Sequence, residues 1–508
     1  MDLILFSTKY FIMPVNNLNY HSVVETFKSL CIFVLLAFQI SANAVEEKLS
    51  PAQLQEDFTQ LYQDLKSSHI NLFINVDEKD YDKYFETISK ELTVPLSPLQ
   101  ARIKFQKFVA FGKVAHAYIN FPEADYRSFR DAGGRTFPVY VNINGDTWTV
   151  SKDYSENALP EGTQITHINS QSVQQLLQTL IKYLSSDTPE IAASILESRL
   201  HQYLWLLEQE QGTLQRAYTM TALRENKLVE LNINLINSKT LTSKIDEDKN
   251  DTAPKDDALR SFSLLKERVG YLKPGPFYNA ENPTDLWNNS QFVTFIDEAF
   301  EFFLDEEVSH LIIDVRQNPG GTNSFSDPLI AWFAKAPFKF ASKFLIRSSE
   351  HAQASNEKRL AQFDDSQNEI SNQLAQGYKS NRHGSVFEFH IQPTSPREGK
   401  RYNGRVFVLI DRSSYSNAVS LAAIVKDYGF GSIIGEASVD FATTYASMET
   451  FSLTNSNIEV GFPKAHIIRP SGDNKAGPVF PDFSLKIDDI NEIAAFVLSD
   501  RAFQDGSN

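Results

Sequence analysis

A group of serines lies where a β-rich run of the chain passes into an apolar helical run. The segment reads SSYSNAVSLAA over residues 413–423 and directly follows RVFVLID. Ser416 stands just before the helical part, where free backbone N–H groups and the helix dipole stabilise negative charge. A nucleophilic serine needs this position, but an ordinary helix N-cap occupies the same place. Ser416 is therefore a candidate nucleophile or a helix cap.

A second segment that could take part in catalysis is HLIIDVRQNPGG, residues 310–321. It is a buried apolar strand that runs into a sharp turn ending at Gly320 and Gly321. Glycines leave backbone N–H groups unobstructed, so such a turn can donate hydrogen bonds to an oxyanion. The same turn is also common in loops with no role other than structure.

Together, these two segments resemble the tail-specific (C-terminal processing) and tricorn-core superfamily of serine peptidases. GSIIGEAS (431–438) and GPVFPD (477–482) are similar to the segments that follow in that superfamily. The resemblance extends over roughly residues 261–487. It implies that Ser416 is the nucleophile, and an α/β core of the ClpP/crotonase-like kind. It also implies the donors of an oxyanion hole, namely Gly320, Gly321 and Asn417.

The resemblance also bears on the base that takes the serine proton. One branch of the superfamily uses a lysine about two dozen residues after the serine, but this chain has Asp440 there. The tricorn-like branch uses a histidine in a segment S-H-A-Y, which reads AHAY here and implies that His116 is the base. Neutral imidazole can accept the serine proton and return it to the leaving amine. By the same likeness, Asp473 would be the acidic third member, with Asn474 as an alternative.

A further module is predicted over residues 135–236. Two β-rich runs join around Asn144-Gly145, which is a strong hairpin signal. LPEGTQITHIN, residues 159–169, is similar to the carboxylate-loop half of a PDZ-like module, with β-strands and a helix. This likeness implies that Gly162 and Ile165 bind peptide. Relatives recognise chain termini by adding the peptide as a β-strand.

Composition divides the rest of the chain. Residues 45–125 have apolar residues at helical spacing and are predicted to form a small helical domain that carries His116. Residues 237–260 are polar and charged, which predicts a linker or exposed loop. Strands and helices alternate over residues 261–500, the predicted catalytic core. Because His116 comes from the helical domain, catalysis requires that domain to dock on the core.

Residues 1–44 are predicted to be a signal peptide. An apolar run at 29–40 is followed by SANA, so cleavage after Ala44 is expected, although an uncleaved anchor is the alternative. The only cysteine, Cys31, lies in this segment. The mature chain would therefore have no disulfide and no thiol nucleophile. These features predict an exported protein, in the periplasm, in the cell envelope or secreted, with no membrane span after cleavage.

The formal net charge of −16 argues against nucleic acid as a partner, because phosphate binding requires clustered Lys and Arg. No H-E-x-x-H, P-loop or dinucleotide motif is found, so neither a metal nor a cofactor is expected. The sequence predicts a serine peptidase that hydrolyses polypeptides through an acyl-enzyme on Ser416. Two alternatives remain: a weak or inactive relative that binds peptide or another ligand, and another acyl-transferring hydrolase.

Overall fold

The part of the chain that follows the predicted signal peptide begins with helices, as its apolar spacing predicts. The computed structural model describes residues 48–252, 259–362, 369–487 and 489–499, so the predicted signal peptide lies outside the described residues. Ser50 and Ser97 each cap a helix, and each makes the capping box with a glutamine three residues later. The helices are α2 (Pro51–Ser68), α3 (Glu78–Glu91), α4 (Pro98–Phe111) and α5 (Glu123–Asp131).

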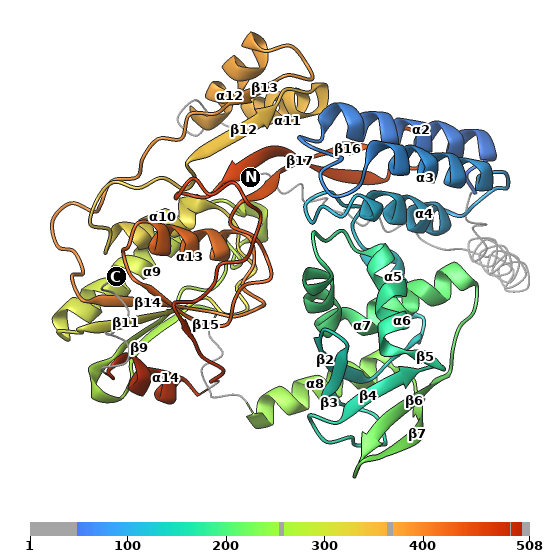
Figure 1. The fold of residues 1–508 in the computed structure, drawn as a ribbon, viewed down its shortest axis with the longest axis horizontal. Helices are drawn as coiled ribbons and strands as arrows, with labels where there is room; N and C mark the ends of the chain where they lie inside the picture. The colour runs from blue at the N-terminus through green and yellow to red at the C-terminus, as the bar shows by residue number, and fades with distance from the viewer. Residues whose placement is uncertain (1–47, 253–258, 363–368, 488, 500–508) are drawn as a thin grey trace, which may run out of the picture. The chain divides into compact units, whose positions relative to one another are not determined.

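Helices α2–α4 pack on a long antiparallel hairpin that lies more than 300 residues later in the chain (Figure 1). The hairpin strands β16 (Thr444–Ser452) and β17 (Glu459–Ile468) belong to a sheet of order β13-β12-β17-β16. The helices and this sheet share one apolar core, which includes Phe58, Phe108 and Phe462. The remaining members of this layer are β12 (Lys343–Arg347), β13 (Val386–Glu388), α11 (Glu350–Gln362) and α12 (Glu369–Ser380).

Residues 135–237 form a separate antiparallel sheet of order β2-β3-β4-β6-β7, with β5 paired to β4. Gly145 has a φ of 57° in the turn between β2 and β3, where the sequence predicts a hairpin. The elements are β1 (Arg135–Thr136), β2 (Val139–Asn144), β3 (Thr147–Asp153), β4 (Gln164–Ile168), β5 (Gln171–Ser172), α6 (Val173–Leu180), η1 (Ile181–Tyr183), α7 (Pro189–Gln211), β6 (Ala217–Arg224), β7 (Lys227–Asn234) and β8 (Ile236–Asn237).

The predicted linker at residues 237–260 is wrong for its larger part, because Ser238–Thr252 is helix α8. Its polar residues bond to the neighbouring sheet: the Nζ of Lys244 donates to the carbonyl of Tyr154 at 2.7 Å. Leu241, in the first turns of α8, is buried. The polar composition therefore reflects a surface helix held by hydrogen bonds to the end of β3. Residues 253–258 lie outside the described part of the chain.

The α/β core is a six-stranded sheet of order β18-β15-β14-β11-β10-β9, in which all neighbours are parallel except β9 and β10. Helices α9, α10 and α13 pack on one face and α14 packs on the other (Figure 1). The elements are β9 (Ser261–Leu264), η2 (Lys266–Arg268), β10 (Gly270–Lys273), η3 (Pro283–Asp285), α9 (Ser290–Asp305), β11 (His310–Asp314), α10 (Asn323–Ala331), β14 (Arg405–Ile410), α13 (Asn417–Asp427), β15 (Ser432–Gly435), β18 (Phe483–Ser484) and α14 (Ile490–Val497).

The order of the core sheet brings the two segments that the sequence singled out together. Strands β11 and β14 are paired neighbours in parallel, with Asp314 opposite Leu409. The glycine turn follows β11 and the serine loop follows β14, so both leave the same edge of the sheet. Among the described helices, none is both long and apolar enough to span a membrane.

The docking of α2 on the hairpin depends on a buried carboxylate. Asp57 is 0% exposed and accepts the backbone N–H groups of Asn455 and Ser456 at 2.8 Å, in the turn between β16 and β17. We predict that Asp57→Ala lowers the free energy of unfolding by about 3 kcal/mol, because these buried donors lose a charged acceptor. Urea denaturation measures the loss.

The neighbouring Glu56 provides the control for this prediction. It contacts the Asn455 side chain from an exposed position at 3.1 Å, so Glu56→Ala should cost less than about 0.5 kcal/mol. Equal effects of the two substitutions would contradict a specific role for Asp57 in docking.

Candidate active site

Ser416 precedes α13 in a strained backbone conformation. Its φ is 52° and its ψ is −118°, and its side chain makes no capping hydrogen bond to the helix. A non-glycine residue with positive φ costs about 1–3 kcal/mol and persists only where its surroundings hold it. Here the amide of Ser416 donates to the Oδ2 of Asp440 at 2.5 Å. The hydroxyl is thus not used as a cap, although the residue stands at the N-cap position.

The glycine turn packs directly against Ser416. A Cβ on Gly320, whose φ is 85°, would lie 2.7 Å from both the Cβ of Ser416 and the backbone nitrogen of Asn417. Asn318 links the two segments, because its carbonyl accepts the N–H of Tyr415 at 2.9 Å. Only glycine can bring the turn this close to the serine loop.

The amides of this turn are not equivalent. The N–H of Gly320 donates to the Oδ1 of Asn318 at 2.9 Å, so it is already engaged within the turn. Asn417 is the first residue of α13, where the helix contains no acceptor for its amide. Of the three predicted oxyanion donors, Gly321 and Asn417 therefore remain the better candidates.

His116 lies in the loop between α4 and α5, and its ring reaches the serine loop. The ring centroid is 6.0 Å from that of Tyr415, the residue just before Ser416. His116 is 5% exposed, and burial lowers its pKa below the usual 6.5. The charge of Asp187 and a hydrogen bond to the backbone of Tyr445 act in the opposite direction on this pKa. The neutral imidazole that a general base requires is therefore the favoured form.

Asp187 is a site residue that the sequence did not reveal. It lies in the short loop before α7, and its Oδ2 accepts the backbone N–H of Ala115 at 3.2 Å. Burial raises the pKa of Asp187, while the positive charge of a protonated His116 lowers it. A carboxylate just before a proline-initiated helix is an ordinary turn residue in sequence, so no local signal distinguishes Asp187.

Asp440 is the second missed residue, since the sequence marked it only as the replacement of a lysine. It is 1% exposed, and burial raises its pKa to about 6. Its Oδ2 holds the amide of Ser416, whereas its Oδ1 is buried without a hydrogen-bond partner among the described residues. Asp440 thus fixes the strained backbone of Ser416 from the loop after β15.

Comparisons with known proteins bear on the family and on the fold. The sequence model of peptidase family S41 matches residues 268–485. This segment belongs to peptidase family S41. For this segment, the predicted relationship to the tail-specific serine peptidases is confirmed, and its enzyme class is that of a serine-type peptidase.

Solved structures share the fold of this chain over most of its length. Mature CPAF is 14% identical, with a TM-score of 0.58, and the match covers 86% of this chain and 93% of that chain. Mature CPAF complexed with lactacystin is 14% identical, with a TM-score of 0.57, over 86% and 94% of the two chains. No curated protein matches the chain at a significant level.

Two sequence predictions do not fit the geometry of the structure. Asp473, the expected third member, is exposed, and its Oδ1 accepts the N–H of Lys475 at 3.0 Å. The carboxylate whose charge acts on His116 belongs to Asp187 instead. Asp473 lies in the loop after β17. The hydroxyl of Thr443, the residue before β16, donates to the carbonyl of Asp473 at 2.5 Å and holds this loop at the surface.

The predicted peptide-binding residues also lie elsewhere than expected. Ile165 is 1% exposed, and its strand β4 is paired with β3 on one side and with β6 on the other. Such a strand has no free edge at Ile165 to which a peptide strand could add. Gly162, with a φ of 80°, makes the turn before β4. The edge strands of this sheet are β2 and β7.

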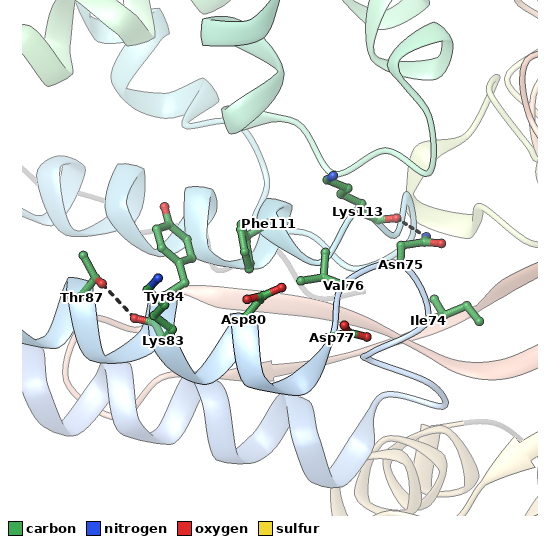
Figure 2. A pocket seen from close by; sticks show the side chains of 10 residues that line it. All are labelled: Ile74, Asn75, Val76, Asp77, Asp80, Lys83, Tyr84, Thr87, Phe111 and Lys113. Carbon is green, nitrogen blue, oxygen red and sulfur yellow. Dashed lines mark hydrogen bonds between the residues drawn. The ribbon is translucent and has the colours of Figure 1, made fainter.

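A groove of about 590 Å³ on the N-terminal helices contains none of these residues (Figure 2). Its lining combines the charged side chains of Asp77, Asp80 and Lys83 with Phe111. The side-chain amide of Asn75 donates to the backbone carbonyl of Lys113 at 2.6 Å. Within the described residues, no group of three or more His, Cys, Asp or Glu side chains is arranged to hold a metal ion.

The contact of the glycine turn with Ser416 yields a test. We predict that Gly320→Ala lowers kcat/KM for peptide hydrolysis by about 100-fold or more, because the added Cβ displaces Ser416 and Asn417 from their positions. Steady-state kinetics measure the change.

Gly477 offers a matched control, since a Cβ there would meet nothing within 4 Å. Gly477→Ala should keep wild-type kinetics. Full activity of Gly320→Ala would show that the close contact is not needed for catalysis.

Proposed function

We propose that this protein hydrolyses peptide bonds through an acyl-enzyme on Ser416, with His116 as general base. The observation that carries this proposal is the convergence of separate chain segments on Ser416. Gly320 packs against Ser416, Asp440 holds its amide, and the His116 ring contacts Tyr415. Each of these groups comes from a different loop, and none is adjacent to another in sequence.

The proposed reaction follows from these positions. Neutral His116 takes the proton from the Ser416 hydroxyl as its oxygen attacks the peptide carbonyl. The resulting oxyanion faces the amide of Asn417, at the positive end of α13, and that of Gly321. Protonated His116 then gives its proton to the leaving amine, and the C–N bond breaks. Water, deprotonated by the same imidazole, hydrolyses the ester and restores Ser416.

We assign different roles to the two carboxylates, Asp187 and Asp440. Asp187 stabilises the imidazolium that forms when His116 accepts a proton, because its negative charge raises the pKa of that ring. Asp440 is a positioning residue, since it bonds the amide rather than the hydroxyl of Ser416. Asp473 is not included, in view of its exposed position.

Further proposals concern the setting of this reaction. The helix and strands at residues 135–236 support a PDZ-like role, with peptide adding at an edge strand, β2 or β7, rather than at β4. The apolar run before SANA supports export of the protein. A polypeptide is the proposed substrate.

Labelling with a fluorophosphonate probe tests the nucleophile. We predict that the probe modifies Ser416 of the wild type, and that His116→Ala slows labelling by about 100-fold or more, because the hydroxyl loses its base. Mass spectrometry of the labelled peptides identifies the site.

Ser416→Ala should abolish labelling, whereas Ser420→Ala, in the helix that follows, should leave it unchanged. Labelling that persists in Ser416→Ala would refute the assignment. Absence of both labelling and peptide hydrolysis in the wild type would instead favour a binding protein on the same scaffold.

The role of Asp187 predicts a pH effect of defined sign. The base acts when His116 is neutral, so kcat/KM falls as the pH drops through its pKa, which lies below 6.5. Asp187→Asn removes a charge that raises this pKa, so the acid limb should move to lower pH. We also expect kcat to fall by about 100-fold or more, because the imidazolium is no longer stabilised.

Asp473→Asn is the matched control and should change neither the acid limb nor kcat. Because Asp440, with a pKa of about 6, titrates in both variants, it does not account for a difference between them. A shifted limb in Asp473→Asn, with none in Asp187→Asn, would return the third role to Asp473.

A further inference from the structure

A cavity of about 550 Å³ adjoins the candidate site. Four of its lining residues are Ala115, Pro319, Tyr415 and Val439. Each directly precedes a residue of the candidate site in the chain: Ala115 precedes His116, Pro319 precedes Gly320, Tyr415 precedes Ser416, and Val439 precedes Asp440. The cavity is therefore next to the reacting groups, where a substrate side chain near the scissile bond would lie.

The far wall of this cavity is largely apolar. It is formed by side chains from the loop after His116, from the loop before α7 and from helix α7, which include Ile119, Phe121, Leu184, Ile191 and Ile195. All but Ile195 are buried in the protein. A cavity of this size and lining favours a bulky apolar group, because burial of apolar surface provides most of the binding free energy.

The charges on the lining are all of one sign. Arg199 and Arg412 line the cavity, and no carboxylate does so among the described residues. Arg412 is paired with Glu197 at 2.9 Å, while Arg199 has no ion pair within the part of the chain that the structure describes. A lysine or arginine side chain of a substrate would meet the unpaired charge of Arg199 here and no carboxylate of the described lining.

One polar group of the lining lacks a partner. Gln106 is 3% exposed, and its Nε2 donates to the carbonyl of Tyr183 at 2.8 Å. This bond fixes which end of the amide is the oxygen, since a carbonyl accepts only from N–H. The Oε1 is buried and accepts no hydrogen bond from the described residues. A buried acceptor of this kind is costly unless a donor reaches it.

We propose that this cavity is a substrate subsite for an aromatic side chain with a hydrogen-bond donor at its tip, tyrosine or tryptophan, and that the Oε1 of Gln106 is the acceptor. The apolar wall takes the ring, Gln106 takes the O–H or N–H, and the unpaired charge of Arg199 disfavours cationic side chains. This inference rests on the proposed function, because it names the substrate class of the same site.

The experiment compares peptides that differ at one position, with Tyr, Phe or Lys placed in turn on each side of the scissile bond. We expect the wild type to cleave the best Tyr peptide with a kcat/KM about ten-fold above that of its Phe counterpart, and Lys worse than either. Gln106→Met removes the acceptor but keeps the length, so the Tyr-to-Phe ratio should fall to about one.

A second variant tests the cavity without touching Gln106. Ile195→Trp fills it from a half-buried position on α7 and should slow cleavage of Tyr and Phe peptides more than that of an Ala peptide. Leu214→Trp, at a site that is 65% exposed and outside the cavity, should leave all ratios unchanged. If Gln106→Met does not fold, the subsite is tested by the Tyr-to-Phe ratio of kcat/KM in the wild type together with the effect of Ile195→Trp.

Binding to the Ser416→Ala protein separates this inference from the proposed function. Fluorescence anisotropy should show that the Tyr peptide binds about ten-fold more tightly than the Phe peptide, whether or not peptide is turned over. Equal cleavage and equal binding of Tyr and Phe peptides, or a ratio unchanged by Gln106→Met, would overturn the subsite. Failure of the probe to label Ser416 would overturn the proposed function instead.

Discussion

Two backbone hydrogen bonds between Tyr118 and Gly461 hold the segment that carries His116 against strand β17. The N–H of each residue donates to the carbonyl of the other, at 3.0 and 2.8 Å. Gly461 permits this pairing, because a Cβ there would lie 2.5 Å from the Tyr118 ring. Since His116 and Ser416 lie 300 positions apart in the chain, the candidate site exists only while this docking holds. The shared apolar core of α2–α4 and the hairpin stabilises the docked state.

Burial of several titratable groups in one place is the second constraint. His116, Asp187 and Asp440 converge with Tyr415, and Asp440 and Asp187 both raise the pKa of Tyr415 in addition to the effect of its burial. Burial favours the neutral imidazole, which is the form that can take a proton, while Asp187 provides the charge that stabilises the product of that step. The same low-polarity surroundings strengthen each of these interactions. Stability and catalysis therefore depend on the same buried contacts.

The sequence predicted the features that local patterns determine. The helices of the N-terminal region, the hairpin at Gly145 and the strand–helix alternation of the core follow from residue types at short spacing. Asp187 and Asp440 could not be predicted in this way, because their roles arise only when distant loops meet. The polar composition of Ser238–Thr252 indicated a linker, although contacts across the chain make it a helix. Asp473 was chosen by its place in a motif, and hydrogen bonds from Thr443 and within its own loop hold it elsewhere.

The central claim is that Asp187 acts on Ser416 through His116. A double-mutant cycle on the rate of fluorophosphonate labelling measures this dependence directly, with His116→Ala, Asp187→Asn and the double variant compared with the wild type. The account predicts that Asp187→Asn slows labelling in the wild-type background and has almost no further effect once His116 is alanine. The same factor in both backgrounds would show that Asp187 acts independently of His116, and would contradict the account.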